Sequence, residues 1–138
     1  MRTTLIRNTV LALCLCSGST ALADYKLNLT ETGLRDYYCT ITVTLTNETD
    51  AALTEVNGFF LSFVEEEQVG RSKGSSFMNV PPGGIATAIF ETPNAPCDDV
   101  TRYDFVIGAC RVGAGFEDRS VCAERMAMEP PFGSALGL

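Results

Sequence analysis

The segment of this chain that best fits a catalytic motif is Gly70-Arg71-Ser72-Lys73-Gly74, which has the G-x-S-x-G spacing of a nucleophile elbow. Such a serine needs a sharp turn from a strand into a helix, and a histidine that accepts its proton. The chain contains no histidine, and the residues after Gly74 favour a strand. Lys73 could replace the base, but adjacent side chains on a turn point apart. The segment is therefore predicted to be a basic hairpin turn, and a weak hydrolase using Ser72 with Lys73 is the alternative.

Two acidic clusters, Glu65-Glu66-Glu67 and Asp98-Asp99, are the other candidates for chemistry. Calcium needs six to eight oxygens that converge from a turn, and neither cluster has the alternating acids and glycine that such a turn uses. Charged residues on an exposed strand also prevent sheets from aggregating. We therefore predict solvated edges, with no metal, no cofactor and no catalytic residue. Carboxylate chemistry by Asp98 and Asp99 is a second route to the weak hydrolase.

The first 23 residues predict export. Arg2 and Arg7 lie before a short apolar run, and the small-residue pattern Ala21-Leu22-Ala23 follows that run. The run is too short to span a bilayer, so we expect a signal peptide over residues 1–23 with cleavage after Ala23. Removing these 23 residues from the chain of 138 leaves 115, enough for one domain that is periplasmic or secreted.

Cysteine usage agrees with an oxidising compartment. Two of the six cysteines leave with the predicted leader, and no C-x-x-C pair remains. The remaining four are predicted to form two disulfides, for which three connectivities exist. We favour Cys39–Cys97 and Cys110–Cys122, because Cys39 opens a strand with a buried face and Cys97 enters another through a loop. The sequence does not exclude the other two pairings.

The segment between Cys110 and Cys122 contains the candidate partner-binding residues Phe116, Glu117 and Asp118. If these cysteines pair, a flexible hairpin is fixed at its base with Phe116 near its tip. An anchored loop with one exposed aromatic residue lowers the entropic cost of binding. The simpler interpretation, which we favour at this point, is that Phe116 folds back onto the core and the bridge is structural.

Net charge limits the partners. The eight basic residues left after the leader face 17 acidic ones, which gives −9 after cleavage and −7 for the whole chain. A nucleic-acid binder needs cations that displace phosphate counterions, and docking on anionic lipid needs them too. We therefore expect no nucleic acid and no membrane span, and a partner that is another protein of the cell envelope.

Residues 37–46 show the clearest secondary-structure pattern, with apolar residues alternating strictly with polar ones that are mostly threonine. A period of two is typical of a strand with one buried and one wet face. Shorter patterns of this kind separated by Gly, Pro and Asn turns predict about seven strands, over residues 25–30, 37–46, 59–64 (with a start near 56), 77–80, 85–92, 103–110 and 119–126. This pattern predicts an all-β sandwich over residues 24–129, followed by a flexible tail over 130–138 that is rich in Gly and Pro.

Three segments carry a family resemblance. Residues 41–47 are similar to a strand that ends in Asn, residues 61–65 follow the family's apolar-x-apolar-apolar-acid order, and Pro82-Gly83 resembles its turn before a strand. Over residues 37–92 the chain thus resembles the FxLYD type of exported bacterial sandwich, a relative of immunoglobulin-like domains. The four cysteines depart from this family and look closer to small four-cysteine exported proteins of unassigned role. The resemblance implies a fold and a compartment, and no reaction.

These observations predict a non-catalytic exported module that binds a protein partner through loops or an edge strand. Two alternatives remain open. One is an inhibitor of an exported hydrolase that uses the Cys110–Cys122 loop, and the other is the weak Ser/Lys or carboxylate hydrolase.

Overall fold

The structure is a computed structural model and describes residues 23–138. The predicted leader therefore lies outside the described residues except for Ala23, and its cleavage stays a prediction.

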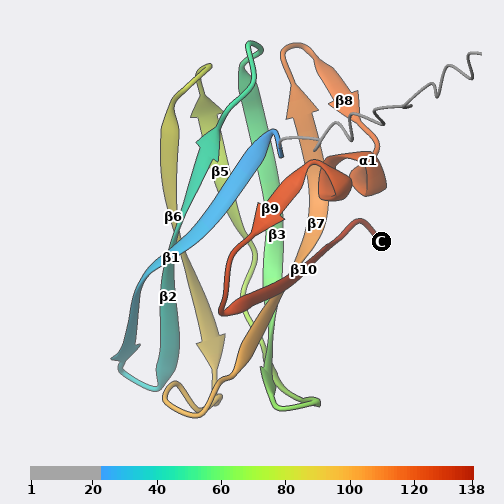
Figure 1. The fold of residues 1–138 in the computed structure, drawn as a ribbon. Helices are drawn as coiled ribbons and strands as arrows, with labels where there is room; N and C mark the ends of the chain where they lie inside the picture. The colour runs from blue at the N-terminus through green and yellow to red at the C-terminus, as the bar shows by residue number, and fades with distance from the viewer. Residues whose placement is uncertain (1–22) are drawn as a thin grey trace, which may run out of the picture.

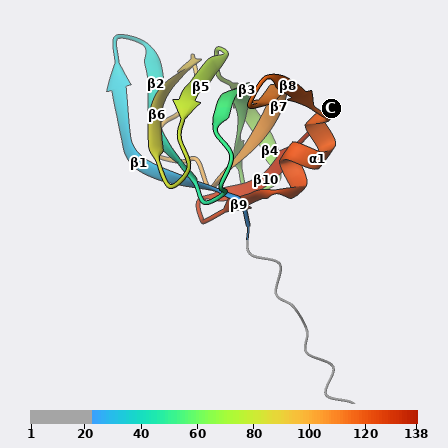
Figure 2. The same ribbon diagram turned by 90° about the horizontal axis from the view of Figure 1, so that it is seen from above.

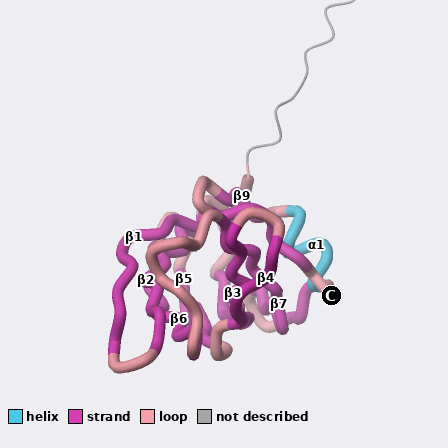
Figure 3. The backbone as a smooth tube through the Cα atoms, turned by 90° about the horizontal axis from the view of Figure 1, so that it is seen from below, coloured by secondary structure: helices cyan, strands magenta, loops and turns pink. Residues whose placement is uncertain are grey.

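Two β-sheets pack face to face, as Figure 1 shows. One sheet has the order β6-β2-β1-β9; the other has the order β10-β7-β3-β4, with β5 also pairing with β3 and β8 with β7. Within residues 23–138, helix is confined to α1 at one end of the described fold (Figure 3). The elements are β1 (Tyr25–Arg35), β2 (Tyr38–Asn47), β3 (Leu53–Val64), β4 (Glu67–Arg71), β5 (Ser75–Val80), β6 (Ile85–Pro93), β7 (Arg102–Val112), β8 (Gly115–Glu117), α1 (Arg119–Glu124), β9 (Met126–Met128) and β10 (Phe132–Leu136).

The core lies between the two sheets and is built on alternation. In β2 the odd-numbered residues from Cys39 to Asn47 are buried, whereas the threonines between them are only partly covered. Phe60 of β3 joins the layers: its ring centroid lies 4.7 Å from that of Phe90 in the opposite sheet and 4.8 Å from that of Phe105 in its own. Buried aromatic pairs of this kind are the main apolar contribution to a small core.

The two long sides of the sandwich differ. Along one side the sheets meet, and the Lys73 amide donates to the Glu91 carbonyl of β6 at 2.8 Å. On the other side, β9 pairs with β1 only from Tyr25 to Leu27. Past Leu27, no strand within residues 23–138 covers the outer edge of β1. The β1–β2 hairpin consequently forms one lateral end of the molecule, as Figure 2 shows.

The structure confirms the all-β sandwich and corrects its details. The described residues form ten strands where about seven were expected, because the short strands β4, β8, β9 and β10 add to the two sheets. The expected turn at residues 70–74 begins later, since Gly70 and Arg71 belong to β4. The expected strand over residues 119–126 was wrong: Arg119–Glu124 is α1, because Asp118 caps a helical turn there.

The C-terminal tail is the largest correction. Residues 130–138 were expected to be flexible, but Phe132–Leu136 forms β10, parallel to β7. Phe132 is buried, and its ring stacks on Phe60 with centroids 5.2 Å apart. One large apolar side chain in the core therefore holds a segment whose Gly and Pro content predicted disorder.

Both favoured disulfides are present. Cys39 pairs with Cys97 and Cys110 with Cys122, with Cα–Cα distances of 5.2 and 6.5 Å. Two disulfides indicate an oxidising, extracytoplasmic environment. Within residues 23–138 there is no helix with the length and apolar character needed to cross a membrane.

Candidate functional site

The β7–β8 hairpin and α1 form a unit that is closed at its base by the Cys110–Cys122 disulfide. The strands pair Cys110 with Glu117, Arg111 with Phe116, and Val112 with Gly115 across a two-residue turn. Gly113 occupies that turn with φ 57°, a left-handed conformation that glycine adopts at no steric cost. Its amide donates to the Ala52 carbonyl at 2.9 Å, which fixes the tip against the start of β3.

Phe116 faces solvent on this hairpin. Its side chain is 77% exposed, and the guanidinium carbon of Arg111 lies 5.0 Å from its ring centroid. The interpretation that Phe116 folds back onto the core is therefore wrong. The reason is the pleat: Cys110 and Glu117 are paired and face inward, so the neighbouring pair Arg111 and Phe116 faces outward.

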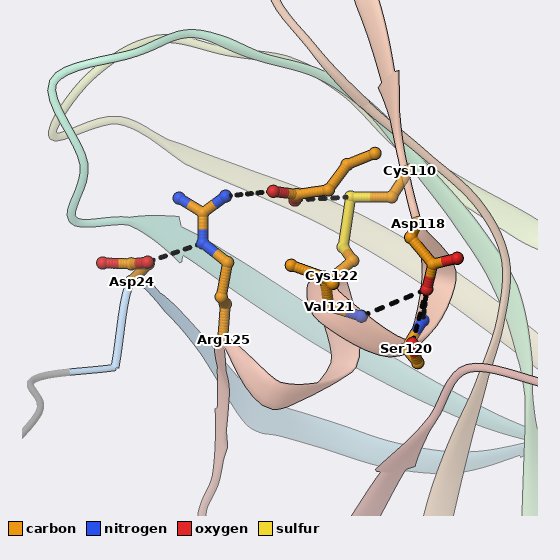
Figure 4. Close-up of a disulfide and its surroundings, with 8 residues drawn as sticks. Asp24, Cys110, Asp118, Ser120, Val121, Cys122 and Arg125 are labelled. Carbon is orange, nitrogen blue, oxygen red and sulfur yellow. Dashed lines mark hydrogen bonds and ion pairs between the residues drawn. A yellow bond between two sulfur atoms is a disulfide. The ribbon is translucent and has the colours of Figure 1, made fainter.

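Glu117 forms an ion pair with Arg125, which is also paired with Asp24, as Figure 4 shows. Its Oε1 lies 2.6 Å from Nη1 of Arg125, and Nε of Arg125 lies 2.6 Å from Oδ2 of Asp24. Burial lowers the pKa of Arg125, but its hydrogen bonds to Asp24 and Glu117 outweigh burial, so the pKa is raised above its ordinary value. A single arginine therefore joins the hairpin to the start of β1.

Tyr25 packs under this arginine, with the guanidinium carbon 5.1 Å from its ring centroid. Burial raises the pKa of Tyr25, the positive charge of Arg125 opposes this, and the carboxylates of Glu117 and Asp24 add to the increase. The hydroxyl is buried and has no hydrogen-bond partner among the described residues. Tyr25 is therefore a neutral, structural member of the cluster.

Asp118 caps α1. Its Oδ1 accepts hydrogen bonds from the Ser120 amide at 2.9 Å and from the Val121 amide at 3.4 Å, and it also accepts the Ser120 hydroxyl (Figure 4). The Ser120 hydroxyl makes the largest contribution to lowering the pKa of Asp118, followed by the two amides. Asp118 thus positions the segment that carries Cys122.

Of the three predicted contact residues, Phe116 and Asp118 are exposed and Glu117 is half-buried. Glu117 and Asp118 hold the hairpin and the helix in place. Arg111, Arg125 and Asp24 also belong to this unit and were not among the residues predicted from the sequence. Arg111 could have been found, because it is the cross-strand neighbour of Phe116 once Cys110 is assigned to the buried face.

The same unit contains the residues most able to hold a metal. The ligating atoms of Cys110, Glu117 and Cys122 lie within 4.8 Å of one another, and Oε2 of Glu117 is 3.8 Å from Sγ of Cys110. Metal-binding cysteines must be thiolates, and here the two sulfurs are bonded to each other. In the oxidised protein this group is therefore a covalent brace whose third member is already ion-paired.

The residues proposed for the alternative hydrolase have structural roles. The Ser72 hydroxyl is buried; it accepts the Phe60 amide at 2.8 Å and donates to the Lys73 carbonyl at 2.9 Å. The Lys73 ammonium lies 3.1 Å from a Glu91 carboxylate oxygen. Asp98 and Asp99 are exposed in the loop between β6 and β7. The structure does not bring these groups together around a common site.

Fold and site together define a class: a small all-β sandwich with two disulfides and, on a braced hairpin, an exposed Phe116 beside the half-buried Arg111. Comparisons of the chain with protein-family models, with curated proteins and with solved structures give no match. The resemblance to the FxLYD type therefore stays a prediction.

Proposed function

We propose that this chain is an exported, non-catalytic interaction module that binds another protein of the cell envelope, with Phe116 and Arg111 as its anchor. The observation that carries the proposal is the 77% exposure of Phe116 on a backbone fixed by a disulfide, an ion-pair cluster and a helix cap. Export with cleavage after Ala23 to the periplasm or the medium is part of this proposal.

A large apolar side chain held in water favours contact with a partner. Burying a phenylalanine gains about 2–3 kcal/mol by transfer from water. A fixed hairpin loses little conformational freedom on binding, so most of that gain becomes affinity. Aromatic residues and arginine are also the commonest residues at interface hot spots.

Charge supports a partner with an acidic rim around an apolar pocket. The chain carries a net charge of −7, yet Arg111 forms no ion pair among the described residues and lies over the Phe116 ring. A carboxylate at the pocket edge would meet this guanidinium while the ring enters the pocket. Such complementarity sets the orientation of binding and raises its rate.

The inhibitor alternative receives less support. An inhibitory loop presents several consecutive residues to a protease cleft, but here Glu117 and Asp118 are held by Arg125 and by the first turn of α1. Phe116 is the large apolar side chain exposed on this tight hairpin, next to a two-residue turn of small residues. This arrangement suits an anchor that enters a pocket.

The test compares partner recovery by variants of the full oxidised protein. The wild type should recover one stoichiometric partner from a cell-envelope extract, and Phe116→Ala should weaken that complex about tenfold or more. The matched control is Ile89→Ala, which removes another half-exposed apolar side chain, from β6. If Phe116→Ala retains the partner as well as Ile89→Ala does, the proposed anchor is wrong.

A further inference from the structure

Part of the outer edge of β1 is not covered by any strand among the described residues. β9 covers β1 up to Leu27, and the hairpin turn at Asp36 ends the strand. Between them, Glu31 to Arg35 pair with β2 on one side only among the described residues. A five-residue strand edge is thus open to a further strand, with the β-bulge between Leu29 and Glu31 at its inner limit.

The turn geometry shows which backbone groups face outward. Arg35 and Tyr38 flank a two-residue turn, so they form a hydrogen-bonded pair, and antiparallel pairs alternate from there. Gly33 then also bonds toward β2, in agreement with the Thr40 hydroxyl that donates to its carbonyl at 3.1 Å. The amide and carbonyl groups of Thr32 and Leu34 therefore point away from β2, toward the open edge.

The charges on this edge are self-complementary. Glu31 and Arg35 lie two residues before and two residues after Gly33 and share one face of the strand. In an antiparallel pair with its two-fold axis at Gly33, Glu31 of each copy stands directly opposite Arg35 of the other. Opposite charges in directly opposed positions stabilise a strand pair, and like charges destabilise it.

The hydrogen-bond pattern fits the same axis. With Gly33 opposite Gly33, Thr32 of each copy faces Leu34 of the other, and these are the residues with outward amides and carbonyls. Both requirements, charge and hydrogen bonding, are met by one register. Sliding one strand by a single residue would separate Glu31 from Arg35 of the other copy. It would also place backbone groups that point toward β2 opposite groups that point toward the open edge.

The opposite face of the strand offers a place for the exposed Leu34. A hollow of about 290 Å³ lies beside the edge, lined by Thr32, Leu34, Pro96 and Cys97 among others. Leu34 is 73% exposed, so its apolar surface is available to a second copy. In this register Leu34 of the second copy stands beside Thr32 at the mouth of that hollow.

We infer that two copies of this chain associate through their β1 edges, as a two-fold antiparallel pair centred on Gly33. The two sheets become one continuous sheet in the order β6-β2-β1-β1-β2-β6, held by four backbone hydrogen bonds, two Glu31–Arg35 ion pairs and two Leu34 side chains. The interface is isologous, as a two-fold dimer requires. It lies on a surface different from the Phe116 anchor.

Charge reversal with rescue tests the pairing. Sedimentation equilibrium of the full oxidised protein should show a dimer. Glu31→Arg places two arginines opposite Arg35 residues, and we expect its dissociation constant to rise about tenfold or more. Arg35→Glu should do the same. The double variant Glu31→Arg/Arg35→Glu restores opposite charges and should dimerise like the wild type. Glu67→Arg, the same charge change on β4 of the other sheet, is the control and should leave the dimer intact.

Cysteine substitution tests the register. Gly33→Cys puts a thiol at the axis, where paired Cα atoms lie about 4.5–5.5 Å apart, within disulfide range. The side chain has room, because a Cβ at Gly33 would lie 3.4 Å from the Thr40 hydroxyl oxygen. Gly33→Cys should therefore give a covalent dimer on non-reducing gels. Thr32→Cys should stay monomeric on the same gels, because its two copies are separated diagonally by more than about 7 Å.

Each other outcome overturns the inference. A wild-type monomer at every concentration would do so, as would a dimer unaffected by both single charge reversals. A dimer that Thr32→Cys crosslinks and Gly33→Cys does not would show another register. A strand from a different protein on this edge would appear as a complex that contains one copy of this chain. None of these results bears on the Phe116 anchor, which is tested separately.

Discussion

Replacing Arg125 by methionine tests the assignment of the Asp24–Arg125–Glu117 cluster as the brace of the hairpin. Methionine keeps much of the apolar stem of arginine and removes the guanidinium. The Glu117 side chain, which is 21% exposed, then loses its only partner at 2.6 Å while it stays close to the disulfide. Asp24, with 40% exposure, loses its partner too but can be hydrated.

The size of the expected loss in unfolding free energy depends on how deeply the ion pairs are buried. Breaking a fully buried pair costs about 3–5 kcal/mol, and breaking an exposed pair costs less than about 1 kcal/mol. Arg125 is 28% exposed, so the cluster lies between these limits. We expect Arg125→Met to lower the free energy of unfolding by about 2 kcal/mol, which an m-value of about 2 kcal/mol per molar urea converts into a midpoint shift of about 1 M.

Urea denaturation of the oxidised protein measures this shift, with a second exposed pair as control. Nζ of Lys26 lies 2.9 Å from Oε1 of Glu48, but the two side chains are 44% and 38% exposed. Lys26→Met should move the urea midpoint much less. Added salt should remove the small difference in midpoint between Lys26→Met and the wild type, because it screens the exposed pair. Adding Glu117→Leu to Arg125→Met should recover part of the loss, because the unpaired carboxylate is gone. Equal midpoints for Arg125→Met and Lys26→Met would refute the assignment.

Three further predictions concern the same domain. Replacing Cys39 and Cys97 by alanine should cost about 4 kcal/mol and replacing Cys110 and Cys122 about 3 kcal/mol, because the bridges close loops with separations of 58 and 12 residues; equal urea midpoints for the two variants would contradict the loop-length argument. Gly58→Ala should destabilise by about 3 kcal/mol, since its Cβ would clash with the Val106 carbonyl oxygen and the Phe105 ring, whereas Gly74→Ala, with its nearest atom at 3.6 Å, should unfold at nearly the wild-type temperature. The pKa of Asp118 is lowered from 3.8, so its ionised form stabilises the fold above that pH and this contribution is lost as pH falls through the lowered pKa; Asp118→Asn should lack that acid-dependent loss in thermal melts, and an unchanged pH profile would be the contrary result.

The sequence predicted the sandwich because its signals were local. Strict alternation around Ile41 and Val43 allowed only one buried face, and four cysteines without C-x-x-C spacing indicated disulfides. The short elements were missed for the opposite reason. β10 depends on the burial of Phe132 against Phe60, more than seventy positions earlier in the chain, and α1 depends on a single capping side chain. A contact between residues far apart in the chain leaves no periodic pattern in the sequence, and neither does a helix of less than two turns.

The candidate site was only partly predictable. Cys110 and Cys122 framed the correct segment, and Phe116 was identified within it. Its exposure could not be read from composition, since it depends on the strand register that places Cys110 inward. The pairing of Asp24 with Arg125 could not be predicted, because the two residues are 101 positions apart and no local pattern links them.

The order in which the cysteines pair has a consequence for biogenesis. Among the four cysteines of residues 23–138, the first bonds to the second and the third to the fourth, so each bridge joins neighbours in the order of synthesis. A thiol oxidase that acts on the chain as it emerges, linking each cysteine to the next one available, produces the native connectivity directly. Oxidation in that order therefore gives the native connectivity without any exchange between wrongly joined sulfurs.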